Sequence, residues 1–294
     1  MRILVTGAWG LVGRAVVANG TSLGHHVAAF DHQSLNITDE PKVNEVFHRE
    51  RPEVVINCAA WTDVDGCELD PERATEVNAR GPELLAKASA KHDALLITIS
   101  TDYVFDGEKN GFYTQADRPN PLSVYGLSKL EGERRAQEVW ARTIVVRSGY
   151  IFGSGGKNFL STIVARAQRG ERIRAINDML GTPTYAPDLA CQIARLAKLG
   201  LAGIYHIVNS GEGASFADFA GAAIAAAGLS EDLIETVSLK TLERPAPRPR
   251  NSRLRCLFSE AIRLPALRPL PEALIEFVKA ETCRKSSNLV SGSV

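Results

Sequence analysis

The strongest constraint on the fold is a glycine-rich segment close to the N-terminus. The apolar run Ile3–Thr6 leads directly into the expected cofactor-binding residues Gly7, Gly10, Leu11, Val12 and Gly13. Glycines at relative positions 1, 4 and 7 let a backbone turn sharply, approach a pyrophosphate and pack the next helix against a sheet. The first N–H groups and the positive dipole end of that helix would face the phosphates. The segment therefore predicts a dinucleotide-binding unit.

The first half of the chain alternates short apolar runs with helical patterns. The runs, rich in Val, Ile, Leu and Thr, are Ile3–Thr6, Val27–Asp31, Val54–Asn57, Leu95–Ser100 and Thr143–Arg147. The helical patterns cover residues 11–23, 40–50, 71–91 and 122–140. This alternation predicts an α/β fold: a Rossmann-type doubly wound parallel sheet with helices on both faces.

The alternation loosens after about residue 150. We expect an NAD(P)-binding Rossmann domain over 1–150 and a smaller C-terminal α/β substrate-binding lobe over 151–283, with some chain crossing back to the Rossmann sheet. Residues 284–294 are expected to form a flexible tail. The proline-rich segment 244–250 must be a loop, because prolines lack N–H donors and restrict their neighbours.

Composition and charge exclude several classes of protein. Lys and Arg total 34, as do Asp and Glu, so nothing electrostatic favours a nucleic acid or an anionic membrane. No apolar stretch approaches the roughly 18 residues of a membrane span, and the N-terminus is typical of a buried strand rather than a signal peptide. Five scattered cysteines predict free thiols and neither a disulfide framework nor a metal site. We therefore expect a cytoplasmic protein.

Residues that follow later strands predict further cofactor contacts. Asp31 lies roughly 20 residues beyond the glycine segment, where a carboxylate would accept hydrogen bonds from ribose hydroxyls. Its charge would repel a 2′-phosphate, so we expect NADH or NADPH with a slight preference for NADH, partly offset by His32. A turn aspartate at a strand end is the alternative. The other expected contacts are Asn36 and Ile37 beside the adenine, and Ala59 and Ala60 against the cofactor.

Tyr125 and Lys129 form a YxxxK motif at the start of a helical pattern. Residues four apart lie on one face of a helix. A nearby ammonium would lower the pKa of the Tyr125 phenol from about 10, so that it protonates an alkoxide more readily, and could also hold a ribose hydroxyl. Thr101, at the end of the fourth apolar run, offers a hydroxyl to a substrate carbonyl. These three residues predict ketone reduction.

Several blocks together resemble the dTDP-4-dehydrorhamnose reductase family of extended short-chain dehydrogenases/reductases. They are TGxxGxxG at 6–13, NxAA at 57–60, STDYVFDG at 100–107, PLSVYGLSKLEGE at 121–133, RSGYIFG at 147–153, GKNF at 156–159, INDMLGTPT at 176–184 and RPRNSR at 248–253. The resemblance covers nearly the whole chain to about residue 280.

The resemblance implies a reaction and assigns residues to it. The C4 ketone of a nucleotide-linked 6-deoxy-4-keto sugar would be reduced by NADH or NADPH, dTDP-4-dehydrorhamnose giving dTDP-L-rhamnose. The implied catalytic residues are Thr101, Tyr125 and Lys129. The implied substrate contacts are Thr101, Asp102, Tyr125 and Tyr150, the last standing where many members carry Trp.

The chain departs from the family at a metal site. Ala15 and Pro187 stand at or near positions where some members place the glutamates of a Mg²⁺-bridged dimer. We therefore expect no metal, and either a monomer or a homodimer. Arg248 and Arg250 either contact a diphosphate or are solvated.

Two alternatives stay open. A nucleotide-sugar epimerase or dehydratase shares the glycine segment and YxxxK but recycles a tightly bound NAD⁺, and dehydratases usually carry Glu where Tyr103 stands. A relative of the family is a non-catalytic, NADP-binding regulatory subunit of a methionine adenosyltransferase. The intact set of Thr101, Tyr125 and Lys129 argues against that second alternative.

Overall fold

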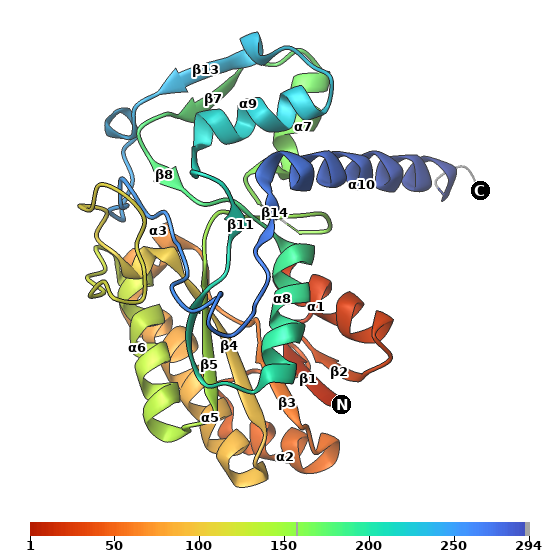
Figure 1. Cartoon of the computed structure of the whole chain (residues 1–294), viewed down its shortest axis with the longest axis vertical. Coiled ribbons are helices and arrows are strands. Elements are labelled where there is room, and N and C mark those ends of the chain that lie inside the picture. Colours follow the sequence, from red (N-terminus) through yellow and green to blue (C-terminus); the bar gives the residue numbers. More distant parts are fainter. Residues whose placement is uncertain (157, 292–294) are drawn as a thin grey trace.

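A parallel sheet forms the base of the protein in a computed structural model that describes residues 1–156 and 158–291 (Figure 1). Within the described residues this sheet has six strands in the order β10-β5-β4-β3-β1-β2, all parallel. They are β1 (Arg2–Thr6), β2 (His26–Phe30), β3 (Val54–Asn57), β4 (Leu95–Thr101), β5 (Thr143–Ser148) and β10 (Gly203–His206). The predicted Rossmann-type sheet is confirmed.

Helices cover both faces of this sheet because side chains alternate along each strand. Ile3 and Val5 of β1 face α1 (Leu11–Ser22) and α8 (Ala186–Leu199), whereas Leu4 faces the opposite layer. That layer consists of α2 (Glu40–Glu50), α5 (Gly81–His92) and α6 (Val124–Val139). β10 and α8 come from beyond residue 150, so the second half of the chain contributes to this layered unit as well.

The helical pattern predicted over 71–91 is interrupted. The structure has α4 (Pro71–Thr75), a π-helical turn (Glu76–Arg80) and then α5. Pro82 has no N–H to donate to the carbonyl of Asn78, which removes an α-helical bond at the break. The Asn78 side chain bonds the backbone of Trp61 (2.8 and 3.0 Å) and the hydroxyl of Ser128 (3.1 Å). It thereby ties the segment after β3 to α6.

The second lobe lies above the sheet in Figure 1 and has its own core, in which Phe152, Phe219 and Phe277 meet. Its helices are α7 (Leu160–Gln168), α9 (Phe216–Ala226) and α10 (Leu270–Ser291). Its strand pairs are β6 (Ile151–Phe152) with β9 (Thr184–Tyr185), β7 (Ile173–Ile176) with β13 (Ile234–Val237), β8 (Leu180–Gly181) with β12 (Ala214–Ser215), and β11 (Asn209–Ser210) with β14 (Leu267–Pro269).

Short helical turns complete the architecture. They are α3 (Val64–Leu69) and three 3-10 turns, Asp102–Val104, Glu231–Leu233 and Leu239–Thr241. Residues 284–291, predicted to belong to a flexible tail, are the last part of α10, which continues to Ser291; 292–294 lie outside the described residues. Across the described chain, no helix combines the length and apolarity needed to cross a membrane.

Candidate active site

The glycine turn between β1 and α1 is built for close backbone approach. Gly7 has φ +64°, and a Cβ there would lie 2.6 Å from the backbone nitrogen of Ala59. A Cβ on Gly13 would lie 2.1 Å from the carbonyl oxygen of Gly7. Gly10 is the N-cap of α1 and offers no side-chain acceptor to the first-turn amides, and that turn carries no acidic residue. The turn therefore fits a pyrophosphate, which the amides and the helix dipole favour.

A cavity of about 500 Å³ opens beside this turn, at the carboxyl ends of the strands. The predicted residues that line it are Gly10, Leu11, Val12, Ala60, Thr101, Asp102, Tyr125, Lys129 and Tyr150. Sequence reasoning missed other lining residues, among them Trp9, Cys58, Ser148 and Asn158. Doubly wound sheets bind ligands at this edge.

Asp31, just beyond β2, has a fixed and ionised carboxylate. Its Oδ1 accepts hydrogen bonds from the Ser34 amide (2.9 Å) and hydroxyl (2.6 Å), and these bonds hold the pKa of Asp31 below its usual value. Asn36 and Ile37, predicted to lie beside the adenine, are not among the residues that line this cavity, and neither is Asp31. The Asn36 side chain instead accepts bonds from Thr38 (3.1 and 3.2 Å), and Ile37 is an apolar side chain buried in the core against Gly81.

The N-terminus of α6 presents the YxxxK pair. The Ser123 hydroxyl caps this helix by accepting from the Gly126 amide at 3.2 Å, and a Cβ on Gly126 would lie 2.2 Å from the Tyr103 carbonyl oxygen. α6 therefore packs closely against the turn after β4, with Tyr125 and Lys129 on its buried side.

Burial shifts the pKa values of Tyr125 and Lys129 and so decides their protonation. It raises the pKa of Tyr125, an effect that hydrogen bonding to Thr101 offsets in part. It lowers the pKa of Lys129 to about 8. The lowering of the Tyr125 pKa by Lys129 that the sequence predicts is not found here: Lys129 is not among the groups that shift this pKa, and its Nζ donates to the carbonyl oxygen of Ile99 at 2.7 Å. Both side chains thus hold their protons near neutral pH.

Thr101 and Asp102 lie at the end of β4 and share a buried hydrogen-bond cluster. The Thr101 hydroxyl donates to Oδ1 of Asp102 at 3.1 Å and accepts from the Tyr103 amide at 3.2 Å. Ser252 donates to Oδ2 of the same carboxyl group. Burial raises the pKa of Asp102 to about 6, and these two hydroxyl donors oppose the rise. Gly149 makes room, since a Cβ there would lie 2.6 Å from the carboxyl carbon of Asp102.

Tyr150 is held in a strained conformation on the cavity wall. Its φ is +45°, a region that bulky residues rarely occupy. Its ring stacks on Phe216 (centroids 4.3 Å apart) and covers Gly181, where a Cβ would lie 2.4 Å from the ring. Its buried hydroxyl has no hydrogen-bond partner among the described residues. A polar atom left in this way on a cavity wall is available to a ligand.

A second pocket of about 330 Å³ lies in the other lobe, beyond the Tyr103 and Phe216 rings. Its lining combines aromatic and cationic side chains: Tyr103, Phe159, Phe216, Arg174, Arg244 and Arg248. Arg248 also forms a two-pronged ion pair with Asp65 of α3 (2.9 and 2.8 Å), and this contact lowers the pKa of Asp65 to about 2. Arg250 lies elsewhere, at a polar surface hollow beside Lys109.

Relatives with assigned names match almost the whole chain. The family described as RmlD substrate binding domain matches residues 1–283. The dTDP-4-dehydrorhamnose reductase of Mycolicibacterium smegmatis is 38% identical over 282 residues, covering 95% of this chain and 85% of that protein. The enzyme of the same name from Aggregatibacter actinomycetemcomitans is 37% identical over 267 residues, covering 85% and 89%.

Solved structures of dTDP-4-dehydrorhamnose reductases are similar to this chain in fold and sequence. A dTDP-4-dehydrorhamnose reductase from Clostridium acetobutylicum superimposes with a TM-score of 0.91 at 34% identity, covering 96% of this chain and 100% of that one. The Bacillus anthracis enzyme, solved in complex with NADP, gives 0.90 at 32%, covering 94% and 98%. The chain therefore belongs to the RmlD family of dTDP-4-dehydrorhamnose reductases, as its motifs predict.

Proposed function

We propose that this chain reduces the C4 ketone of dTDP-4-dehydrorhamnose to give dTDP-L-rhamnose, with NADH or NADPH as reductant. The observation that carries the proposal is the meeting of Thr101, Tyr125 and Lys129 on one cavity wall beside the glycine turn. The names of the relatives support the choice of substrate.

The cofactor would lie along the cavity from the glycine turn. The first-turn amides of Leu11 and Val12 would hold its pyrophosphate, and Lys129 would hold the nicotinamide ribose. The B. anthracis relative was solved in complex with NADP, which supports this use of the site. When bound, the nicotinamide supplies the hydride that the C4 carbon accepts.

Tyr125 is suited to supply the proton. Burial raises the pKa of its phenol, so the hydroxyl carries its hydrogen at neutral pH and can give it to the oxygen of C4 as charge develops there. The Lys129 ammonium, fixed by the Ile99 carbonyl, adds a positive charge to the same wall. Thr101 and Tyr150 offer hydroxyls that orient the sugar.

The second pocket suits the nucleotide end of the substrate. The rings of Phe159 and Phe216 offer apolar faces to a base, and Arg174, Arg244 and Arg248 offer charge to a diphosphate. The pockets adjoin, because Tyr103 packs edge-on against Tyr125 with ring centroids 6.1 Å apart and Tyr150 stacks on Phe216.

An assay with purified substrate tests this proposal. NADH and NADPH oxidation is followed with dTDP-4-dehydrorhamnose and, separately, with other 4-keto sugar nucleotides. We expect the highest kcat/KM with dTDP-4-dehydrorhamnose and one cofactor oxidised per sugar reduced. Faster turnover of another 4-keto sugar nucleotide would overturn the assignment. So would a finding that no turnover depends on added NADH or NADPH.

The choice between NADH and NADPH is expected to depend on Asp31. The Asp31→Asn variant removes the charge while keeping a side-chain oxygen for Ser34, so repulsion of a 2′-phosphate falls. We expect the NADPH-to-NADH ratio of kcat/KM to rise by about tenfold, as for a unit charge a few ångströms from a phosphate in water. The control is Asp39→Asn, an equal change in charge at the exposed N-cap of α2. An equal NADPH-to-NADH ratio of kcat/KM in Asp31→Asn and Asp39→Asn would show that Asp31 does not discriminate against the 2′-phosphate.

A further inference from the structure

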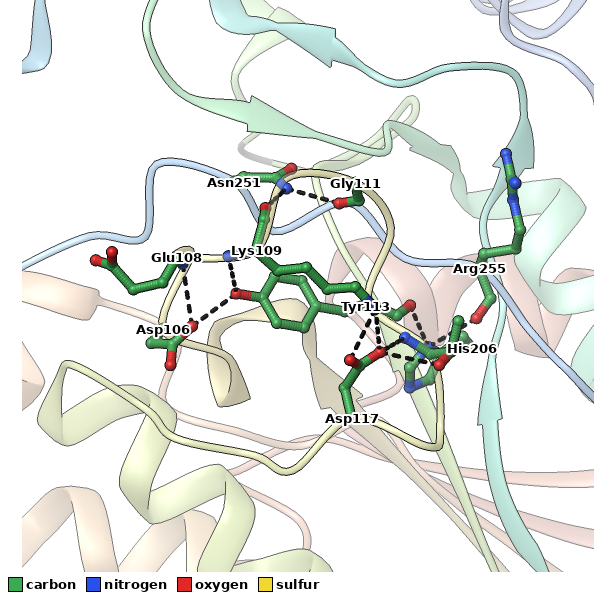
Figure 2. A network of polar contacts seen from close by, with 10 residues as sticks. Asp106, Glu108, Lys109, Gly111, Tyr113, Asp117, His206, Asn251 and Arg255 are labelled. Atoms are coloured by element: carbon green, nitrogen blue, oxygen red, sulfur yellow. Dashed lines mark hydrogen bonds and ion pairs between the residues drawn. The ribbon is translucent and has the colours of Figure 1, made fainter.

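A strap from the second lobe, residues 244–255, crosses to the Rossmann unit and is anchored along its length. Arg248 pairs with Asp65, as described above. The Asn251 side chain donates to the carbonyls of Lys109 (2.5 Å) and Gly111 (2.6 Å), contacts that Figure 2 shows. Ser252 stands between these anchors and the end of the strap, and its amide donates to the carbonyl of Leu180 at 2.8 Å.

The far end of the strap is fixed by the network around Tyr113 (Figure 2). The Tyr113 amide donates to the carbonyl of Arg253 at 2.6 Å, and its carbonyl accepts from the Arg255 amide at 2.9 Å. Buried His206 places Nδ1 3.2 and 3.1 Å from the carbonyls of Tyr113 and Arg255. Two carbonyl neighbours require a hydrogen on that nitrogen. The backbone on both sides of Ser252 is thus held.

This anchoring points the Ser252 hydroxyl at one oxygen of the Asp102 carboxyl group. Ser252 is 1% exposed and Asp102 3%. Ser252 donates to Oδ2, whereas the other oxygen, Oδ1, faces the Thr101 hydroxyl at 3.1 Å. The two oxygens of this carboxyl group therefore have different neighbours, one from each lobe.

The Thr101 hydroxyl has one hydrogen and two neighbours that can accept it, Asp102 and Tyr125. When Asp102 is a carboxylate, Thr101 donates to it and can only accept from Tyr125, which draws the phenol hydrogen away from the substrate. When Oδ1 carries a proton, Asp102 donates to Thr101, whose hydrogen turns to Tyr125. The phenol hydrogen is then free to point at the substrate oxygen.

We propose that Ser252 is a positioning residue: by donating to Oδ2 of Asp102 it confines the carboxyl proton to Oδ1, the oxygen that can pass it through Thr101 to Tyr125. The inference rests on the proposed function. As the C4 oxygen takes the Tyr125 proton, Tyr125 takes that of Thr101 and Thr101 takes that of Asp102. Solvent water returns a proton to Asp102 after the product leaves.

Among Asp102 and the phenols around it, Asp102 is the group that exchanges a proton near neutral pH. The groups facing it are the phenols of Tyr103, Tyr125 and Tyr150, and burial raises the pKa of each, so all three stay neutral. The strap's cations Arg244 and Arg248, which approach Tyr103, are paired with Asp65. Asp102, with a pKa of about 6, changes charge within the working range of an enzyme.

The test compares Ser252→Ala with Ser89→Ala, which removes another buried serine hydroxyl, one in α5 with no partner among the described residues. At pH 5, where Asp102 is protonated in both proteins, we expect Ser252→Ala to lower kcat by about tenfold to a hundredfold with little change in KM, as for a disturbed proton transfer. Ser252→Thr should restore most of the lost kcat, and the kcat of Ser89→Ala should match that of the unaltered protein. An unchanged kcat, or an effect on KM alone, would contradict the role.

The pH dependence supplies a readout that a purely structural role would not move. Activity that needs protonated Asp102 falls as pH rises through its pKa. Losing the Ser252 donor removes a bond that favours the carboxylate, so this pKa, and the alkaline limb of kcat, should move upward.

A measurement without turnover separates this inference from the proposed function. Infrared titration of the carboxyl stretch, assigned by its loss in Asp102→Asn, should find Asp102 titrating near pH 6 and at higher pH in Ser252→Ala. An unshifted titration would overturn the role of Ser252 even in an active enzyme. Failure of the unaltered protein to reduce the sugar would overturn the proposed function instead.

Discussion

Replacing Tyr125 with phenylalanine is expected to lower kcat by about 10²- to 10⁴-fold, because the hydroxyl that protonates the C4 oxygen is lost. The ring itself stays packed against Tyr103 and the buried cluster with Cys67 and Ala74. The glycine turn is untouched, so the dissociation constant for NADH should change by less than about twofold. Steady-state kinetics and calorimetric titration measure the two quantities.

Tyr205→Phe is the matched control for this variant. It also removes one phenolic hydroxyl, but that hydroxyl donates to the carbonyl of Leu201 at 3.1 Å, at the edge strand β10 of the sheet. We expect its kcat to equal that of the unaltered protein. Near-normal turnover in Tyr125→Phe, or an equal loss in both variants, would remove Tyr125 from the reaction.

Replacing Arg147 with methionine is expected to lower the free energy of unfolding by about 3–5 kcal/mol, the usual cost of leaving one partner of a buried ion pair alone. Arg147 of β5 and Glu133 of α6 have side chains only 3% and 2% exposed, and their closest atoms lie 2.6 Å apart. The Ser100 hydroxyl donates to the same carboxylate. Urea denaturation followed by circular dichroism gives the change.

The double variant Arg147→Met with Glu133→Gln separates the isolated charge from the lost packing. It should be more stable than Arg147→Met alone, because no uncompensated carboxylate remains buried. Glu133 is also the charge that most favours the protonated form of Lys129, one turn earlier in α6, so the pKa of Lys129 should fall in the double variant. A loss of less than about 1 kcal/mol in the free energy of unfolding of Arg147→Met would mean that buried Glu133 does not need Arg147 as its partner.

The parts of this site that the sequence predicts are those in which local spacing carries the information. The glycine turn and the pair Tyr125 and Lys129 each lie within a few consecutive residues, so their geometry follows from one turn and one helix. The contacts of Asn36 and Ile37 with the adenine stay a prediction, because position after a strand does not reveal where a side chain points: Asn36 bonds its own turn and Ile37 enters the core.

Other features depend on segments that only the fold brings together. Phe216 and Arg174 meet at the second pocket from α9 and β7, and no local pattern connects them. Ser252 reaches Asp102 from 150 positions away. The break after Thr75 did have a local signal, Pro82, but the apolar periodicity on both sides of it masked the break.

The central claim is net hydride transfer from an external cofactor to the sugar, and isotope transfer tests it most directly. The purified protein is incubated with dTDP-4-dehydrorhamnose and NADH deuterated on the transferred position at C4 of the nicotinamide, and the product is analysed by NMR and mass spectrometry. We predict dTDP-L-rhamnose with one deuterium at its C4 and one NADH oxidised per sugar. A converted sugar without deuterium would contradict the account and indicate recycling of bound NAD⁺, as in an epimerase or dehydratase. Cofactor binding without conversion would also contradict it, and would favour a regulatory role.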